Sequence, residues 1–232
     1  MRNTLILFTL LLTSIYSKGQ QSALSISYKA SMFQPDNVNR TVYTYNYARQ
    51  WLDQKMDYFE MLQGWDIRYN VQNKGKGFEF GINRMRASNE ATGIQTNGQR
   101  GYRKISLKSG SAFVGITKRF YSRKHFQLSY TLSLDWMGFK GYTFYAQGSK
   151  DFGPSEGGFK NNRLANTGGL NILIPFGKYF GLQLRPYYQQ PWSRANVEGL
   201  GEAISGASGS GTKREFIGNY GCLVGLRLVL GD

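Results

Sequence analysis

Residues 126–136, Phe-Gln-Leu-Ser-Tyr-Thr-Leu-Ser-Leu-Asp-Trp, alternate strictly between apolar and polar side chains. A period of two is typical of a β-strand whose two faces meet different surroundings. The apolar side chains of this stretch would all lie on one face, and small or charged polar groups would lie on the other. The apolar face needs a core or a lipid phase beside it, whereas the polar face needs water or polar partners.

The same alternation recurs seven more times in the chain. Such a series predicts an antiparallel sheet in which every strand has one apolar and one polar face. In the fourth run, the parity of the apolar positions changes between Leu107 and Ala112, so the pattern predicts a β-bulge at Gly110. The predicted strands cover residues 24–32, 59–72, 78–83, 105–116, 126–136, 170–176, 180–189 and 220–230.

The segments between these runs alternate in length. The expected short turns are 73–77, 121–124 and 177–178, and the expected long loops are 35–57, 91–102, 141–162 and 193–214. Aromatic side chains flank both kinds of connection, as rings do at the two membrane–water interfaces. Short turns at one end and long loops at the other are typical of an outer-membrane barrel. The predicted fold class is all-β, an eight-stranded antiparallel up-and-down transmembrane β-barrel.

The N-terminal residues have the features of an export signal. Arg2 provides a positive charge, residues 5–15 form an apolar run, and small residues follow at a cleavage site. The apolar run is shorter than the ~20 residues that a membrane-spanning helix needs. We therefore expect a cleaved signal peptide at 1–19, followed by one barrel domain at 20–232.

This domain resembles the small eight-stranded outer-membrane β-barrels of the OmpX-like type in its strand pattern, its loop order and its two belts of aromatic residues. The resemblance implies insertion in the outer membrane of a Gram-negative bacterium. Many such barrels end on an aromatic residue that the insertion machinery reads, whereas this chain ends Leu230-Gly231-Asp232. The resemblance therefore does not extend to that signal.

The chain carries a net charge of +15. For an exported protein, outer-membrane lipids and the phosphates of lipopolysaccharide are the expected partners of such a charge. Nucleic acid is not expected as a partner, because no basic helix or recognised nucleic-acid module is present. The aromatic residues of the first long loop offer a contact surface to another envelope protein. The residues expected to contact lipopolysaccharide are Arg84, Arg86, Arg103, Lys104 and Lys140.

An eight-stranded barrel has room inside for side chains but not for a wide channel, so its inward charges must be paired. The predicted register turns four basic and four acidic side chains inward: Lys29, Glu60, Asp66, Arg68, Glu79, Asp135, Arg185 and Arg227. Lys108, beside the predicted bulge, is not assigned to either face. This neutral set predicts a polar plug in the lumen, with a narrow ion pathway or a buried acid–base pair as functional alternatives.

Few residues have the chemistry of catalysis or of metal binding. One Cys and one His make a metal site improbable. No cofactor is expected, because the Gly/Ser-rich segment 206–213 resembles a phosphate-binding loop but has its last two residues in the wrong order. His125 is the one candidate base for a lipid-modifying serine enzyme. It falls at a short turn, so we expect no enzymatic activity.

The function predicted from the sequence is that of a non-enzymatic integral outer-membrane protein with a structural or surface-interaction role. A narrow pore or transporter for small or hydrophobic solutes is the first alternative, and a lipid-modifying enzyme is the second. A soluble lipocalin-like carrier is the main alternative fold. That carrier would require apolar side chains inside the barrel and polar side chains outside.

Overall fold

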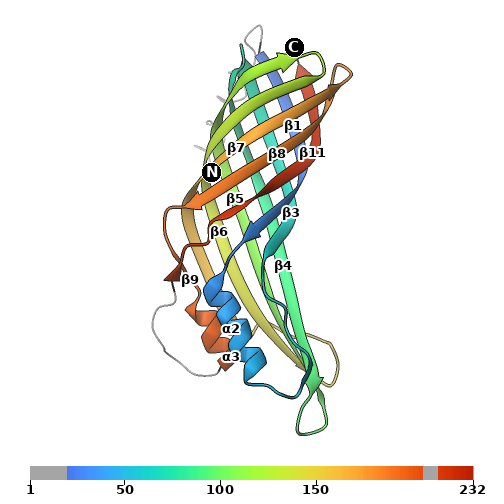
Figure 1. Cartoon of the computed structure of the whole chain (residues 1–232), viewed down its shortest axis with the longest axis vertical. Coiled ribbons are helices and arrows are strands. Elements are labelled where there is room, and N and C mark those ends of the chain that lie inside the picture. Colours follow the sequence, from blue (N-terminus) through green and yellow to red (C-terminus); the bar gives the residue numbers. More distant parts are fainter. Residues whose placement is uncertain (1–19, 206–213, 232) are drawn as a thin grey trace, which may run out of the picture.

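The computed structural model describes residues 20–205 and 214–231, so the predicted signal peptide and the Gly/Ser-rich segment 206–213 lie outside the described residues. Eight antiparallel strands each pair with the next, and the last pairs with the first, which closes a ring (Figure 1). The ring strands are β1 (Gln20–Phe33), β3 (Met61–Asn73), β4 (Lys76–Ile94), β5 (Arg100–Arg123), β6 (Phe126–Gln147), β7 (Gly157–Phe176), β8 (Phe180–Pro191) and β11 (Asn219–Gly231). The predicted eight-stranded barrel is confirmed.

The two faces of the strands meet opposite environments. On β6, the outward Leu132 is 53% exposed, whereas the inward Ser133 and Asp135 are buried. The same arrangement holds around the ring, since Leu226 on β11 is 57% exposed while Arg227 is buried. Apolar side chains on the outside and polar ones inside are the reverse of what a soluble carrier requires, so the outer face must lie against lipid. The fold is a transmembrane β-barrel of the outer-membrane type.

No helix in residues 20–205 or 214–231 is long and apolar enough to cross a membrane.

The predicted bulge at Gly110 is wrong. The register between β4 and β5 is continuous through this position. Ile105 and Leu107 point inward and are completely buried, and Phe113, further along the same strand, also points inward and is buried. The parity of the chain therefore never changes there. What changes is the environment of the inner face, which is apolar beyond the membrane-facing part of the barrel and polar within it.

The barrel is taller on one side than on the other. Strands β4 to β7 have 19 to 24 residues, whereas β1, β3, β8 and β11 have 12 to 14. The predicted long loops 91–102 and 141–162 are therefore mostly strand, and only residues 95–99 and 148–156 connect β4 to β5 and β6 to β7. The four long strands form a wall that extends past the closed ring, at the bottom of Figure 1.

The opposite end of the barrel carries the short turns. The turn from β3 to β4 places both Lys74 and Gly75 at positive φ, 48° and 80°, which is the backbone conformation of a tight two-residue hairpin. In the turn from β7 to β8, Gly177 has a positive φ of 76°. Both chain ends of the ring, in β1 and β11, meet at this end of the barrel.

The wall of long strands is covered by the connections of the four short strands. These form a cap of α2 (Asp36–Tyr47), β2 (Leu52–Gln54), β9 (Ala195–Asn196), α3 (Glu198–Ser205) and β10 (Arg214–Glu215). Helix α2 buries Val38, Thr41, Val42 and Tyr45, whose spacing places them on one side of a helix. Both helices lie at the end away from the turns, and α3 packs against β7 and β6.

An apolar core joins the cap to the inner face of the wall. Phe59, which the sequence pattern placed on the lipid-facing side of a strand, is buried in this core before β3 begins. Phe139 of β6 is its centre: its ring packs edge-on against Phe33, at a centroid distance of 6.4 Å, and against Phe159 at 5.3 Å. The inner face of the barrel is therefore sealed by apolar side chains at the cap end.

We predict that Phe139→Ala opens this core. Removing a completely buried aromatic side chain should cost about 3–5 kcal/mol, because the cavity left behind cannot be filled by its neighbours. Limited proteolysis should cut the cap faster while the barrel stays folded. Tyr47→Ala, at a 76% exposed position of α2, is the control and should change the rate little. Equal rates in the two variants would contradict the assignment of this core.

Candidate functional site

The lumen contains a chain of paired charges. Arg68 donates two hydrogen bonds to Asp66, at 2.6 and 3.0 Å, and one to Glu79 at 3.0 Å. Glu79 also accepts two bonds from Arg185, both at 2.9 Å. The Arg68 guanidinium lies over the Phe113 ring, 4.2 Å from its centroid. Bidentate pairing of this kind fixes both partners and offsets the cost of burying their charges.

A second cluster in the lumen provides a carboxylate with neutral hydrogen-bond donors. Asp135 accepts hydrogen bonds from Ser133 and Thr167, each at 2.7 Å, and from the Gln189 amide. Gln189 in turn accepts a bond from Asn219 at 2.8 Å. Each strand contributes its inward polar positions, so the register set by the apolar outer face brings these groups together.

The structure places seven of the eight predicted interior charges inside the barrel, all buried: Lys29, Asp66, Arg68, Glu79, Asp135, Arg185 and Arg227. The prediction that the eighth, Glu60, points into the barrel is wrong. Glu60 is exposed and precedes β3, because the chain before Met61 leaves the barrel to join the cap. Lys108, left unassigned, points outward.

Arg163 is a buried interior cation that the sequence reasoning missed. The pattern was followed on this strand only from Leu170, although the strand begins at Gly157. Extending the alternation back by three steps from Leu170 places Leu164 outward and Arg163 inward, as the structure has them. The interior set is therefore not neutral, since acidic partners are fewer than the cations.

The lumen ends in an apolar layer at the cap. Leu62, Met85 and Met137 each point inward from a different strand and are at most 2% exposed. With Phe139 they form a layer between the polar groups and the cap. Polar side chains thus fill the membrane-facing part of the lumen, and apolar side chains fill it next to the cap. A lumen filled by side chains is expected for so narrow a barrel.

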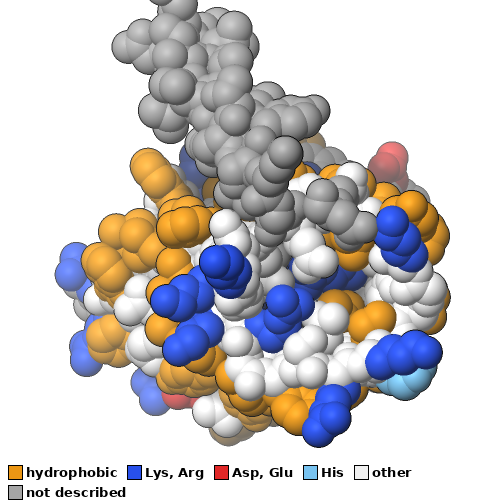
Figure 2. Space-filling view, turned by 90° about the horizontal axis from the view of Figure 1, so that it is seen from above, with side chains coloured by type: hydrophobic (Ala, Val, Ile, Leu, Met, Phe, Trp, Pro, Cys, Tyr) orange, Lys and Arg blue, Asp and Glu red, His pale blue; other side chains and the backbone are white. Residues whose placement is uncertain are grey.

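His125 is exposed in the turn between β5 and β6, at the opposite end from the cap. Lys and Arg side chains gather around this end, which Figure 2 shows from above. Among the described residues, no group of three or more His, Cys, Asp and Glu side chains could hold a metal ion.

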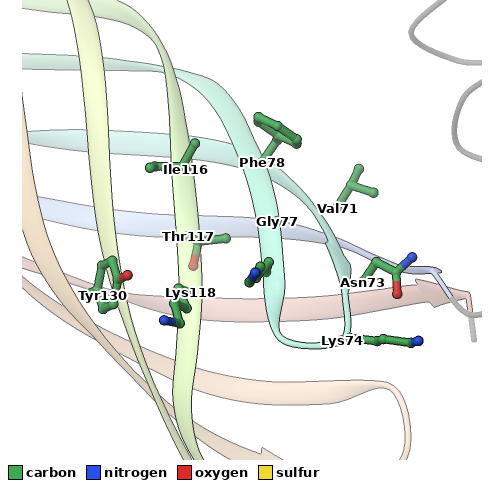
Figure 3. A pocket seen from close by; sticks show the side chains of 10 residues that line it. Val71, Asn73, Lys74, Gly77, Phe78, Ile116, Thr117, Lys118 and Tyr130 are labelled. Carbon is green, nitrogen blue, oxygen red and sulfur yellow. The ribbon is translucent and has the colours of Figure 1, made fainter.

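A groove of about 750 Å³ lies on the outer wall beside the first short turn. The apolar side chains of Val71, Phe78 and Ile116 lie along it, with Lys74 and Lys118 nearer the turn (Figure 3). An apolar surface edged by lysines is what the boundary between lipid tails and anionic headgroups requires.

The five residues expected to contact lipopolysaccharide differ in the face of the barrel on which they lie and in their partners within the protein. Arg84, Arg86 and Lys140 are on the outer face. Arg103 is not: it lies over the Tyr45 and Tyr145 rings and pairs with Glu156, because odd positions of β5 point inward. Lys104 is outward but forms an ion pair with Glu90 at 3.2 Å.

Two parts of the cap, β10 and α2, are joined by a contact at the start of the helix. Glu215 of β10 accepts a hydrogen bond, 2.7 Å long, from the backbone N–H of Asn37 at the start of α2. A carboxylate there also meets the positive end of the helix dipole. Burial nevertheless raises the pKa of Glu215 above its ordinary value, and the bond from Asn37 offsets this only in part.

No family model matches the chain, and no curated protein matches it. Among solved structures, it is similar to Ail, the attachment invasion locus protein of Yersinia pestis, with 15% identity and a TM-score of 0.43 over 90% of this chain and 98% of that one. The outer membrane protein OprG of Pseudomonas aeruginosa is 9% identical, with a TM-score of 0.49 over 93% and 98%. The outer membrane protease OmpT of Escherichia coli is 10% identical, with a TM-score of 0.43 over 93% and 98%.

We predict that Glu79→Gln destabilises the barrel by about 3–5 kcal/mol, because two buried guanidinium groups lose their shared carboxylate. Urea unfolding in detergent, followed by the heat-dependent gel shift of folded barrels, measures this loss. Glu60→Gln makes the same chemical change at an exposed position and should alter stability by less than about 0.5 kcal/mol. A larger effect for Glu60→Gln than for Glu79→Gln would contradict the register.

We also predict a pH dependence of the cap. Because the pKa of Glu215 is raised in the folded state, its contribution to stability is fully present below the ordinary value of 4.5 and is lost as the pH rises through the raised value. Proteolysis of the cap should therefore accelerate as the pH rises above that value. Glu215→Gln should remove this part of the pH dependence.

Glu90 titrates in the opposite sense and does not obscure that result. Hydrogen bonds from Lys150 and Lys104 lower its pKa, so its contribution is lost only as the pH falls below the ordinary range. A wild-type cap whose proteolysis rate stays level above pH ~4.5 would contradict the role given to Glu215.

Proposed function

We propose that the protein is an integral β-barrel of the bacterial outer membrane that works through its outer surfaces and not through its lumen. The observation that carries this proposal is the filled interior. A series of ion pairs crosses the lumen, linking Asp66, Arg68, Glu79 and Arg185 in that order. The apolar layer around Phe139 closes the lumen toward the cap. A barrel so filled has no wide aqueous route along its axis.

The outer wall supports placement in the membrane. Its apolar band would face hydrocarbon, and the closed ring pairs each strand with a neighbour on both sides, which leaves no free sheet edge there. The basic turn end, with Lys74 and Lys118 beside the groove, is suited to anionic headgroups. Lipids of the outer membrane, including lipopolysaccharide, are therefore the first partners of the protein.

The cap supports a role in surface interaction. Tyr43 and Tyr47 of α2 are 55% and 76% exposed, and their rings stack at a centroid distance of 6.1 Å. Tyr58, in the same connection, is also more than half exposed. Exposed aromatic rings on a rigid helix are typical anchors of protein–protein interfaces. The cap is thus the surface for a partner protein of the envelope.

The position of His125 supports a non-enzymatic role. A serine nucleophile requires a base within hydrogen-bond reach, and the imidazole is the one such base in the sequence. It lies exposed in a turn, away from the cap and from the groups collected in the lumen.

Membrane fractionation followed by planar-bilayer recording tests the proposal. We expect recovery in the outer-membrane fraction, a heat-dependent gel shift and no conductance steps from the purified protein, with a general porin as the positive control. Regular single-channel steps would replace the proposal with the narrow pore. Recovery as a soluble protein without the shift would overturn the membrane placement itself.

A further inference from the structure

Four cations stand directly beside one another across four neighbouring strands of the outer wall. The register pairs Arg86 of β4 with Lys108 of β5, Lys108 with Lys140 of β6, and Lys140 with Lys160 of β7. All four occupy positions of the outward parity, and none of them is buried. We call these four residues the cation row.

The cation row is costly for the protein alone. Directly opposite side chains on an antiparallel sheet are ~5 Å apart, and like charges in such pairs are destabilising. Within residues 20–205 and 214–231, no ion pair joins a member of the row to a carboxylate. Two outward positions further along β4, the same wall does place an acid opposite a base, Glu90 opposite Lys104. The row is therefore an exception to local charge pairing on this wall.

A groove of about 550 Å³ lies beside the row, on its membrane-facing side. In the register, the residues next to the row are Arg84, Gly110, Gly138 and Asn162, each opposite the next. The two glycines form the floor, since neither has a side chain to fill it. At Gly138 the space is open: an added Cβ would meet only the Asn162 side chain at 3.4 Å and a backbone oxygen at 3.8 Å.

Two tryptophans mark the lipid boundary at the groove. Trp136 occupies the outward position of β6 just before Gly138 and is 67% exposed, and Trp65 lies opposite Arg84 and is 42% exposed. Both line the groove together with Arg84, Lys108 and Lys140. Indole rings settle where lipid tails meet headgroups, so the groove lies at headgroup depth on the cap side of the barrel.

We propose that the groove and the cation row bind the phosphorylated headgroup of an outer-leaflet glycolipid, of the lipopolysaccharide type. The row spans three strand spacings, ~14 Å, which is longer than one phosphate can contact. A sugar headgroup with more than one phosphate spans it, places its sugar over the glycine floor and extends its acyl chains past Trp136. Basic side chains bind phosphate oxygens through charge-assisted hydrogen bonds, which relieves the repulsion within the row.

This inference rests on the proposed membrane placement, and it changes the expected lipopolysaccharide contacts. Arg84, Arg86 and Lys140 stay in the set, and Lys108 and Lys160 join it. Arg103 and Lys104 leave it, because both already have partners within the protein.

The first test compares two charge variants of the folded protein in detergent. Lys108→Gln/Lys140→Gln/Lys160→Gln removes three of the four charges of the row, and Lys74→Gln/Lys76→Gln/Lys118→Gln removes the same number of charges at the turn end. Binding of diphosphoryl lipid A, measured by native mass spectrometry, should weaken by roughly tenfold or more in the first variant and change little in the second. An equal loss of lipid A binding in the two variants would show that the lipid is attracted by the overall positive charge of the protein, and it would overturn the proposed site.

The second test separates a shaped site from a charged patch. Gly138→Leu adds an apolar side chain at the floor of the groove without altering charge, and its Cβ would make only ordinary contacts with Asn162 and the Gly110 backbone. It should weaken binding of diphosphoryl lipid A to a similar extent as the charge variant. Unchanged binding would contradict the groove as the place of the headgroup.

The lipid probes separate the sources of phosphate. Monophosphoryl lipid A should bind less tightly than diphosphoryl lipid A, and phosphatidylglycerol should be insensitive to neutralisation of the row. Phosphatidylglycerol bound as tightly, and lost in the same variant, would assign the row to phospholipid and overturn the proposal. A heat-dependent gel shift in every variant shows that the barrel is folded. A failure of the lipid-binding proposal is thereby distinguished from a failure of the proposed membrane barrel itself.

Discussion

The closure of the sheet between β1 and β11 is the constraint on which the rest of the structure depends. In hydrocarbon no water is present to pair with backbone N–H and C=O groups, so a sheet with free edges cannot remain there. Eight strands close this ring, and the narrow interior that results admits side chains and little else. The inward carboxylates are therefore held by groups within that space, as Glu79 is by Arg68 and Arg185.

The environment of the inner face changes along the strands, although the alternation of the chain does not. Within the membrane-facing part, the outer side is apolar and the inner side is polar. Beyond it, α2 and α3 cover the inner side, and residues such as Ile105 and Leu107 become the core of the cap. The barrel and the cap are thus two cores built on the same strands with opposite requirements.

The uneven height of the barrel gives its outer surface two different ends. At the turn end, basic residues surround a narrow rim. At the cap end, the wall formed by β4 to β7 continues outward and carries the cation row just past Trp136. Neighbouring cations with no carboxylate partner repel one another unless solvent or an anionic ligand compensates their charge. Because the lumen is closed, the outer surface of the barrel is where such a ligand would bind.

The sequence by itself determined the strand number, the faces of the strands and most of the lumen. Alternation is local, so Asp66, Arg68 and Glu79 could be assigned to the interior without knowing what each would meet. It failed at positions where a strand leaves the bilayer: Glu60 and Phe59 follow the pattern but belong to the chain that enters the cap.

Only the tertiary structure decided the cap, the height of the wall and the cation row. The cap depends on contacts between α2, α3 and strands distant in the sequence, and no local period encodes such contacts. The row depends on register, which brings Arg86, Lys108, Lys140 and Lys160 together although they are far apart along the chain. The alternation of apolar and polar residues determines which way a side chain points. Its neighbour across the sheet is determined by the register in which the whole ring closes.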